Sequence, residues 1–474
     1  MADEPKIDTV AKEILEMRAR AKVCQVLNSG ILEMRSHARE YLPKRPKEAE
    51  LDWQARRDEA DFFPAFSTAL EAYVGKPLGS PIVVTDAPAS VESALENVDL
   101  QGNDFDSFMR PVFKAALRDG VTWIVADYHQ VPAGLTLEQE RALGARPYLV
   151  HVPLENVIDC RSEVTASGLH RCVQFRYKEC VSVPSGRWGT AEVERIRVLE
   201  PGMVEVWEKQ KGLDGETVWV MLPDLSGPVS MPEVMMNCLV PDQDSWCKGE
   251  PPLEALAWLN VAHWQSSSYQ RSILNVARVP LLAADEDLRQ DTNAPIDIGV
   301  KGLITGFKGL KYVEHTGAAI AAGVADILAL EDRMRRVAGQ ALDSKVKTAT
   351  EAGTDSRDAS SKLRAWVWTF QDFLEETLRL MALWVGEKAG GSVSLDMDWD
   401  EAEVGADMLT VWSSMRAQGQ ISQKTHLKLL QGAELLGDAT VDEEIARLEM
   451  EAPAPMPVIP FRKAASAEAL PPVA

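Results

Sequence analysis

Three groups of acidic side chains are the candidates for a chemical role in this sequence. They lie at 285–287, 396–401 and 442–444, and each could offer carboxylate oxygens to a divalent cation. The second group lies in DMDWDEAE, which alternates carboxylates but lacks the glycine at the sixth position and the glutamate at the twelfth that define a calcium loop. We favour the alternative interpretation, in which each group is solvated acidic surface.

Motifs for catalysis are absent from the sequence. The seven histidines form no HExxH or HxH pattern, and GKPLGS at 75–80 lacks the residues of a phosphate-binding loop. No GxGxxG follows a predicted strand, and there is no GxSxG turn. We therefore predict no catalytic residue, no metal ligand and no cofactor, and we expect a protein that is not an enzyme.

Charge and cysteine usage narrow the class of protein further. The formal net charge is −22, which argues against a protein that wraps nucleic acid by neutralising phosphates. The six cysteines include no CxxC pair, so we expect no zinc site and free, mostly structural thiols in a reducing cytosol. Cys172 and Cys180 could come together, and so could Cys238 and Cys247. The acidic N-terminus and the lack of long apolar runs predict neither secretion nor a membrane span.

Two long helices over 317–386 are the elements around which the chain is organised. The second, of about 28 residues, carries four large aromatics and must pack against a neighbour along its length. Apolar residues at helical spacing are Ile320, Val324, Ile327, Leu328, Met334 and Val337 in the first, and Leu363, Trp366, Val367, Phe370, Phe373, Leu374, Thr377, Leu378, Met381, Trp384 and Val385 in the second. The polar segment between them is either a plain connection or a working surface.

The rest of the chain alternates helical and strand patterns. The segment 104–120 has a capping aspartate at its start and Gly120 at its end, and the β-prone run VTWIVADY follows it. Residues 170–235 form several strand-like runs that Gly and Pro separate, as in an antiparallel sheet. Further helices are predicted over 4–40, 48–79, 251–278, 402–419, 422–434 and 440–451, and strands over 81–84 and 393–399. The fold class is therefore α+β, mainly helical.

Taken in order, these segments resemble the portal proteins of tailed bacteriophages, and in particular a portal-like family first catalogued as a domain of unknown function, DUF4055. The resemblance covers about residues 30–450 and depends on an ordered set of segments. Where the family usually has Asn-Trp, this chain has Asp159-Cys160. The matching segments are REYLPKRPKEAELDWQARRDEADFFPAFSTALEAYVGKPLG, DFDSFMRPVFKAALRDGVTWIVADY, RPYLVHVPLENVIDCR, EPPLEALAWLNVAHWQSSSYQRSILNVARVPLL and GQISQKTHLKLLQGAELL.

The resemblance implies the phage portal fold, with wing, stem, clip and crown parts. The borders that it implies are an N-terminal arm at 1–30, a wing at 31–250, stem helix 1 at 251–278, a clip at 279–314, stem helix 2 at 317–342, a tunnel-loop region at 343–356, a long wing/crown helix at 357–389, a crown at 390–450 and a disordered tail at 451–474.

The role that the resemblance implies is a homo-oligomeric ring, expected to be a 12-mer, at one capsid vertex of the virion. Double-stranded DNA would pass through it weakly and without sequence preference during packaging and ejection. Implied partners are the large terminase, a head–tail adaptor, and the major capsid or scaffold protein, with assembly in the host cytoplasm and no membrane. Net acidity suits such a channel, because each phosphate contact would resist sliding.

Two sets of residues are candidate contact sites in this portal interpretation. The clip lysines (Lys301, Lys308 and Lys311) would dock the packaging motor or an adaptor; the alternative is a solvated hairpin. The tunnel residues (Lys345, Lys347, Thr348 and Glu351) would lie at the channel, where the two lysines would touch DNA transiently.

Three other functions stay open at this point. Another head–tail connector or virion structural protein would also be acidic and rich in helices. A soluble enzyme would need a nucleophile, a metal site or a phosphate loop, and a DNA-binding regulator would need more positive charge. Long paired helices that flank a small β insertion favour the portal interpretation over these.

Overall fold

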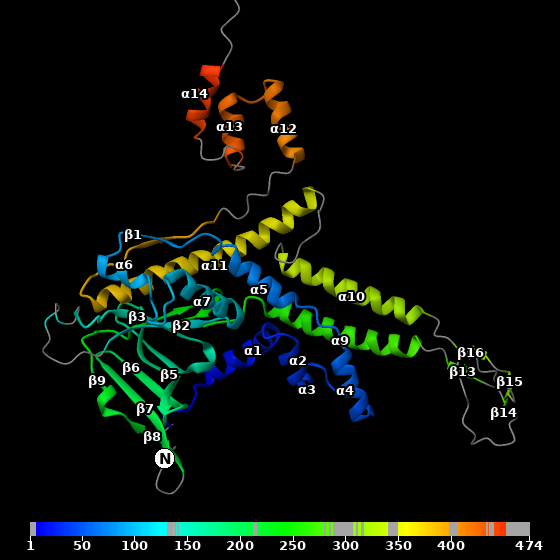
Figure 1. Ribbon diagram of the computed structural model, residues 1–474, viewed down its shortest axis with the longest axis horizontal. Helices are drawn as coiled ribbons and strands as arrows, with labels where there is room; N and C mark the ends of the chain where they lie inside the picture. The colour runs from blue at the N-terminus through cyan, green and yellow to red at the C-terminus, as the bar shows by residue number, and fades with distance from the viewer. Residues whose placement is uncertain are drawn as a thin grey trace, which may run out of the picture. The chain divides into compact units, whose positions relative to one another are not determined.

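The computed structural model describes residues 6–129, 136, 139, 142–211, 216–278, 281–283, 286–287, 307–309, 311–313, 317–339, 349–397, 406–432, 435 and 440–451. Two compact units divide the chain at Met397–Asp398. Helices predominate, and the strand pairs among the described residues are antiparallel, so the α+β class is confirmed (Figure 1). Among the described helices, none is long and apolar enough to span a membrane.

Short helices open the first unit where one long helix over 4–40 was predicted. That prediction is wrong in extent, because Gly30 has a φ of 86° and separates α1 from α2. Backbone of this sign is readily available only to glycine, so the chain turns there instead of continuing as helix. The helices are α1 (Lys12–Asn28), α2 (Ile31–Ser36), α3 (Ala38–Tyr41), α4 (Glu50–Glu59) and α5 (Ala65–Gly75).

Helix α7 (Phe105–Asp119) and the strand after it confirm the prediction for 104–128. The Asp104 side chain accepts a hydrogen bond of 2.8 Å from the backbone N–H of Ser107 and so caps the helix. Gly120 ends it in the left-handed region, at a φ of 84°, with the backbone of Glu250 too close for any side chain. Strand β2 (Thr122–Tyr128) begins two residues later.

A three-stranded sheet in the order β10–β2–β3 lies beneath the long helix α11 (Ala349–Trp384). Figure 1 shows α11 running along this sheet, with α7 near it. The predicted apolar stripe of α11 is buried from Leu363 to Met381. The remaining elements of this region are α6 (Ala89–Leu95), β1 (Val83–Thr85), β3 (Pro147–Val152), β10 (Met236–Leu239), β11 (Gln243–Ser245), β12 (Lys248–Gly249) and β17 (Ser392–Ser394), which pairs with β1.

The second sheet confirms the antiparallel hairpins predicted over 170–235. Its strands follow one another in space as they do in sequence. One face joins α1 and β2 in a core that includes Phe175 and Tyr177, and the other face buries Ile158 and Ile196. The strands are β4 (Val157–Val164), β5 (His170–Ser185), β6 (Gly189–Glu200), β7 (Met203–Lys211) and β8 (Thr217–Met221), with β9 (Gly227–Pro228) beside β7.

A disulfide corrects the expectation that the thiols are free. Cys238 on β10 is bonded to Cys247, whose Cα lies 6.0 Å away, because β10 and the turn before β12 lie side by side. Cys172 and Cys180 are eight residues apart on one extended strand, roughly 26 Å at ~3.3 Å per residue, so these two cannot meet. Cys172 instead lies beside Cys160, and the proximity and burial raise the pKa of the Cys160 thiol.

The second unit contains the three predicted C-terminal helices, which are confirmed. They are α12 (Ala406–Ala417), α13 (Gln423–Gly432) and α14 (Val441–Glu451). The Thr440 hydroxyl accepts from the N–H of Glu443, and the Glu443 carboxylate accepts from the N–H of Thr440 at 2.9 Å. This reciprocal cap starts α14. The predicted tail beyond Glu451 lies outside the described residues.

Candidate functional site

Two helices that lie side by side form the most distinctive feature of the first unit. They are α9 (Glu254–Ala277) and α10 (Ala318–Val337), shown in green and yellow-green in Figure 1. At 1.5 Å per residue α9 is about 36 Å long. It begins directly after Pro251-Pro252, where the sequence predicted a helix start, and proline is tolerated at that position because the first N–H groups have no partner within the helix.

Three polar contacts join the two helices and show that they are antiparallel. The Gln270 side chain donates to the carbonyl oxygen of Ile320 at 3.1 Å. The Ser266 hydroxyl donates to Asp326 at 2.5 Å, and Nε2 of His263 lies 3.7 Å from Oε1 of Glu331. Residue numbers fall along α9 as they rise along α10. These three residues of α9 therefore face α10. Other polar residues of the helix, Asn260, Gln265 and Ser268, contact α5, α3 and α4 instead.

Gly323 sets how closely α10 approaches α9. A Cβ atom built at this position would overlap the side-chain amide of Gln270. That amide is buried and bonded to Ile320, so any side chain at 323 would displace it. The glycine thus allows close approach of the two helices beside Gln270.

His263 is a buried histidine at the same interface. Its side chain is 6% exposed, and neither ring nitrogen has a hydrogen-bond partner among the described residues. Burial lowers its pKa despite the nearby Glu331 carboxylate. The ring is therefore neutral at pH 7 and packs at 5.5 Å from the ring of Phe63 as a core residue.

The outer surface of the helix pair carries apolar side chains that are exposed among the described residues. In α10 the buried residue is Met334, whereas Val324, Leu328 and Val337 are 45%, 56% and 47% exposed. In α9 Trp258 is 51% exposed. The apolar stripe predicted for α10 exists, but it is largely solvent-exposed in the single chain.

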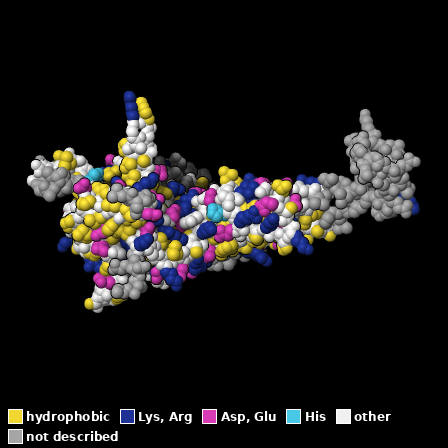
Figure 2. Space-filling view, turned by 90° about the horizontal axis from the view of Figure 1, so that it is seen from below, with side chains coloured by type: hydrophobic (Ala, Val, Ile, Leu, Met, Phe, Trp, Pro, Cys, Tyr) yellow, Lys and Arg dark blue, Asp and Glu magenta, His cyan; other side chains and the backbone are white. Residues whose placement is uncertain are grey.

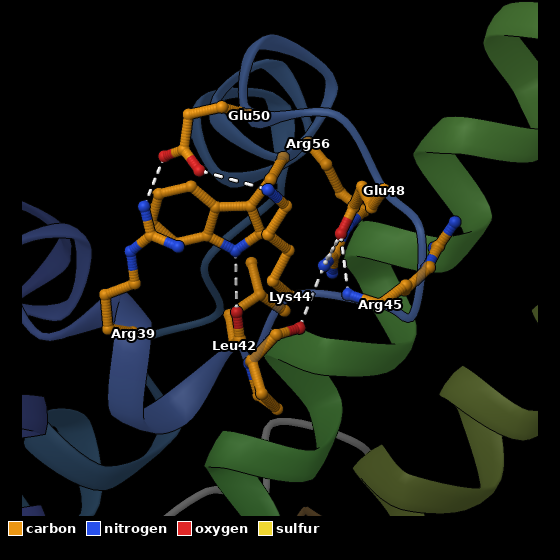
Figure 3. Close-up of polar contacts among 9 residues, drawn as sticks. Arg39, Leu42, Lys44, Arg45, Glu48, Glu50 and Arg56 are labelled. Atoms are coloured by element: carbon orange, nitrogen blue, oxygen red, sulfur yellow. Dashed lines mark hydrogen bonds and ion pairs between the residues drawn. The ribbon is translucent and has the colours of Figure 1, made fainter.

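The base of the pair is fixed by a buried ion pair between Arg56 on α4 and Glu48 in the loop before it. Figure 3 shows the Glu48 carboxylate between Arg45 and Arg56, beside α9. Nε of Arg56 lies 2.7 Å from Oε1 of Glu48, with side-chain exposures of 3% and 8%. Arg56 also donates to the carbonyl oxygen of Pro43 at 3.0 Å and to Oγ of Ser268 on α9 at 3.2 Å. These bonds tie the loop before α4 to the middle of α9.

Asn260 and Tyr73 provide two further attachments. Helix α5 has no cap of its own, and the Asn260 side chain accepts from the N–H of Phe66 at 3.0 Å and donates to the carbonyl of Phe63 at 2.9 Å. The Tyr73 hydroxyl donates to the carbonyl oxygen of Ala338 at 2.7 Å and so fastens the end of α10. The inner ends of both helices are therefore rigidly held, and sequence periodicity gave no signal for these contacts.

Small antiparallel strand pairs lie at the opposite end of the helix pair. Strand β13 follows α9 and pairs with β16, which precedes α10, and β14 pairs with β15. The small β insertion predicted between the two helices is thus present as paired strands. Their bounds are β13 (Leu281–Ala283), β14 (Glu286–Asp287), β15 (Phe307–Lys308) and β16 (Lys311–Val313).

Three of the predicted contact residues lie among the described residues. Lys308 is exposed on β15, Lys311 lies on β16, and Lys301 lies outside the described residues. Of the tunnel residues, Glu351 lies on α11, and Lys345, Lys347 and Thr348 lie outside the described residues. Helix α11 begins at Ala349 and not at 357, so part of the polar segment is helical, which corrects the predicted start of that helix.

The described members of the acidic groups show no metal-binding arrangement. Among the described residues, no three His, Cys, Asp or Glu side chains gather in a form that could hold an ion. Asp442 pairs with Lys424 at 2.8 Å, and Glu443 caps α14. The 442–444 group therefore serves the start of a helix, while Asp285 and 398–401 lie outside the described residues.

Comparison with known proteins matches one part of the chain to a family. The family is described as "Domain of unknown function (DUF4055)", and it matches residues 252–385, from the start of α9 to just past the end of α11. No curated protein matches the sequence.

Three solved structures share low similarity with the chain. The "Virion of native gene transfer agent (GTA) particle" has 13% identity and a TM-score of 0.37 over 79% of this chain and 91% of that chain. The "Neck of native GTA particle computed with C12 symmetry" has 13% identity and a TM-score of 0.38 over 78% and 89%. The "Neck of empty GTA particle computed with C6 symmetry" has 14% and 0.39 over 78% and 90%. Because these TM-scores lie below 0.5, we base the proposal below on this chain's own residues.

Proposed function

We propose that this chain is a structural subunit of a phage-type virion and, more narrowly, a portal protein that assembles as a ring around a DNA channel. The observation that carries the proposal is the helix pair, which is firmly held at one end, carries strand hairpins at the other, and exposes apolar residues between them. A long helix with one buried residue gains little stability from its own chain, because helix stability in proteins comes mostly from packing. Neighbouring copies would cover Val324 and Leu328.

A heterologous ring explains why the exposed apolar residues are spread around the pair. In a head-to-tail ring each subunit uses two different surfaces, one for each neighbour, and closes without an unpaired end. An isologous dimer would need one self-complementary patch instead. Exposed apolar residues on both helices, such as Trp258 on α9 and Leu328 on α10, suit the first arrangement.

The parts of the chain take the following proposed roles. Helices α9 and α10 form the stem (251–278 and 317–342), and the strand hairpins form the clip (279–314), which would dock the large terminase and the head–tail adaptor. The two sheets with their helices form the wing (31–250), which would face the major capsid or scaffold protein. The other parts keep the borders given above for the tunnel-loop region, the long wing/crown helix and the crown. The proposed location is the portal vertex of the virion, after assembly in the host cytoplasm.

The proposed channel requires weak contact with DNA. The net charge of −22 opposes tight binding to phosphates, and binding that depends on many phosphate contacts would resist movement of the cargo. A conduit of this kind needs no catalytic residue of its own, and energy would come from the motor bound at the clip.

Native mass spectrometry with negative-stain microscopy tests the proposal. We expect the purified chain to form closed rings of about twelve copies with a central hole. A variant with Val324→Ser and Leu328→Ser should shift the mass toward monomer, because it removes apolar contact between copies. A control with Leu32→Ser, at an exposed leucine on α2, should keep the rings. Rings that persist in the double variant would overturn the role given to α10 in assembly. Virus particles that contain this chain but no ring of it would overturn the portal proposal.

A further inference from the structure

A large polar cavity lies in the first unit, away from the helix pair. Its volume is about 1220 Å³, and its walls come from β2, β3, β5, β6, the loop before β10 and the end of α11. Three arginines, a glutamate, two aspartates and a histidine line it together with aromatic side chains. Neither the sequence motifs nor the proposed channel accounts for this cavity.

The cavity lies where the inner face of the second sheet changes from apolar to charged. Phe175 pairs with Leu199 across β5 and β6, and both are buried in the core. The next inward-facing pair is Tyr177 with Arg197, since side chains alternate between faces along a strand. Arg197 makes an ion pair of 2.7 Å with Asp127 from β2, which closes one wall of the cavity.

The next cross-strand pair on this sheet contains a carboxylate, that of Glu179. Glu179 on β5 pairs in register with Arg195 on β6, which in turn lies opposite Glu208 on β7. Arg195 binds Glu208 at 2.9 Å. No hydrogen bond or ion pair to Glu179 is seen among the described residues, and burial raises its pKa although the charges of Arg197 and Arg195 oppose this rise. The cavity therefore presents a partly buried acid that lacks a direct partner.

Aromatic rings form a second wall. The rings of Tyr128 and Trp384 stack at 5.6 Å and 21°. The Trp384 indole is held in place by a hydrogen bond of 2.9 Å to the carbonyl oxygen of Ala126. Stacked rings beside a carboxylate suit an occupant that is both aromatic and cationic.

The chain carries such a group at the tip of the β5–β6 hairpin. Trp188 is 87% exposed, and the guanidinium of Arg187 lies 4.6 Å from the centre of its ring. The two strands pair as far as Ser185 and Gly189, beyond the last pair that β6 makes with β7 at Arg195, so the hairpin projects as a ribbon. In Figure 2 a narrow projection ends in basic and hydrophobic side chains.

The tip cannot enter the cavity of its own chain. Glu179 and Arg187 lie eight residues apart along the extended ribbon, which places them roughly 26 Å apart at ~3.3 Å per residue. The same length lets the tip reach a neighbouring copy. A projecting group and a complementary cavity at different places on one molecule are the two halves of a heterologous contact.

We propose that the cavity receives the Arg187-Trp188 tip of a neighbouring copy of this chain, with the indole against Tyr128 and Trp384 and the guanidinium on Glu179. The proposal rests on the proposed ring, to which it adds a specific contact between adjacent wings. Buried tryptophan and arginine side chains are typical of the few residues that contribute most of the binding energy of an interface. The cavity would then be filled only when neighbouring copies have assembled.

Site-specific photo-cross-linking in the full-length chain tests this contact. A photoreactive phenylalanine analogue replaces Trp188, and assembled rings are irradiated, separated by mass and mapped by peptide sequencing. We expect cross-links between two copies that map to 127–129, 224–230 or 384–385. Cross-links from the tip to other segments in intact rings would overturn the contact and leave the ring standing. Cross-links to a different virion protein would overturn it as well, and a wild-type chain that forms no rings in the virion would instead refute the proposed function.

Charge exchange gives a second, independent test. Arg187→Glu should raise the protein concentration needed for half-assembly by about tenfold or more, and so should Glu179→Arg. Combining the two should restore assembly toward the wild-type value, because the pair is re-formed with its charges reversed. Leu169→Ser, at the exposed tip of the β4–β5 hairpin, is the matched control and should assemble normally. Wild-type assembly of Arg187→Glu would overturn the contact, whether or not Glu179→Arg folds.

Discussion

Replacing Arg56 by methionine should destabilise the base of the helix pair by about 3–5 kcal/mol. The Arg56 and Glu48 side chains are almost fully buried, and the guanidinium also binds the carbonyl of Pro43 and the hydroxyl of Ser268. Methionine has a similar length but no charge. The Glu48 carboxylate would then be buried with one backbone N–H, that of Arg45, as its remaining partner. An unpaired buried charge is the source of the expected loss.

Hydrogen exchange of α4 and α9 is the assay, because it reports local stability in a chain of this size. The double variant with Arg56→Met and Glu48→Gln should recover most of the protection, since neither charge is then left unpaired. Arg57→Met on the same helix is the control; it breaks a more exposed pair with Asp58 and should cost less than about 1 kcal/mol. If Arg56→Met behaves like this control, or if the double variant is no better than the single one, the reasoning fails.

The same pair predicts a loss of stability in acid. Hydrogen bonds from Arg56 lower the pKa of Glu48 from 4.5 to about 2. A carboxyl whose pKa is lowered on folding stabilises the protein fully above the unfolded value, and this contribution disappears as the pH falls from about 4.5 through 2. The difference corresponds to about 3 kcal/mol. Urea midpoints at pH 5 and pH 2.5 should therefore differ more in the wild type than in Glu48→Gln, and equal differences would contradict the assignment.

Further predictions concern the helix pair and its two ends. Gly323→Val should displace the Gln270 amide and lower the melting temperature, at a cost of about 1–3 kcal/mol, whereas Ala322→Val, at an exposed neighbour, should not. Changing the clip lysines to glutamate should weaken binding of the terminase or adaptor in a pull-down, and unchanged binding would remove them from the docking surface. Lys345→Ala with Lys347→Ala should alter the rate of DNA packaging, and a wild-type rate would place these lysines away from the cargo.

Short sequence patterns predicted a helix or strand correctly where capping or turn residues mark both of its ends. Helix α7 has an aspartate cap at Asp104 and a glycine at Gly120. The run after it is rich in β-branched residues, which favour a strand. The hairpins over 170–235 were found for the same reason, because alternating patterns and turn residues specify both strands and connection. Such elements depend on short-range chemistry, which a single sequence contains in full.

Helix boundaries without an apolar pattern were predicted less well. Helix α11 starts at Ala349, although 349–356 has no apolar stripe. That segment has one glycine and no proline, and its alanine and glutamate residues have good helix propensity. Periodicity reports burial, so a prediction based on periodicity places a helix end where burial ends. In the opposite direction, apolar residues on both sides of Gly30 suggested one helix where the backbone turns.

Contacts between distant segments could not be predicted from one sequence. Arg56 meets Ser268, and Asn260 caps α5, across sequence separations of 212 and 194. Each needs a particular rotation of two helices about their axes, and no local pattern specifies that rotation. The cavity at Glu179 is of the same kind, because it depends on how far β2 reaches over the second sheet. The residue types were visible in the sequence, but their partners were not.

The two apolar stripes predicted over 317–386 differ in how far they are buried. Helix α11 buries Trp366 beside Tyr73 of α5 and Phe370 against Phe113 of α7, as a stripe of large aromatics requires. The stripe of α10 leaves Val324 and Leu328 in solvent. Both patterns have the same physical meaning, namely that a neighbour must cover them. For α11 that neighbour is within the chain, whereas for α10 the described residues supply little more than α9. A second copy of the chain is the simplest source of the missing surface, and the stripe therefore predicts assembly as directly as its counterpart predicts the fold.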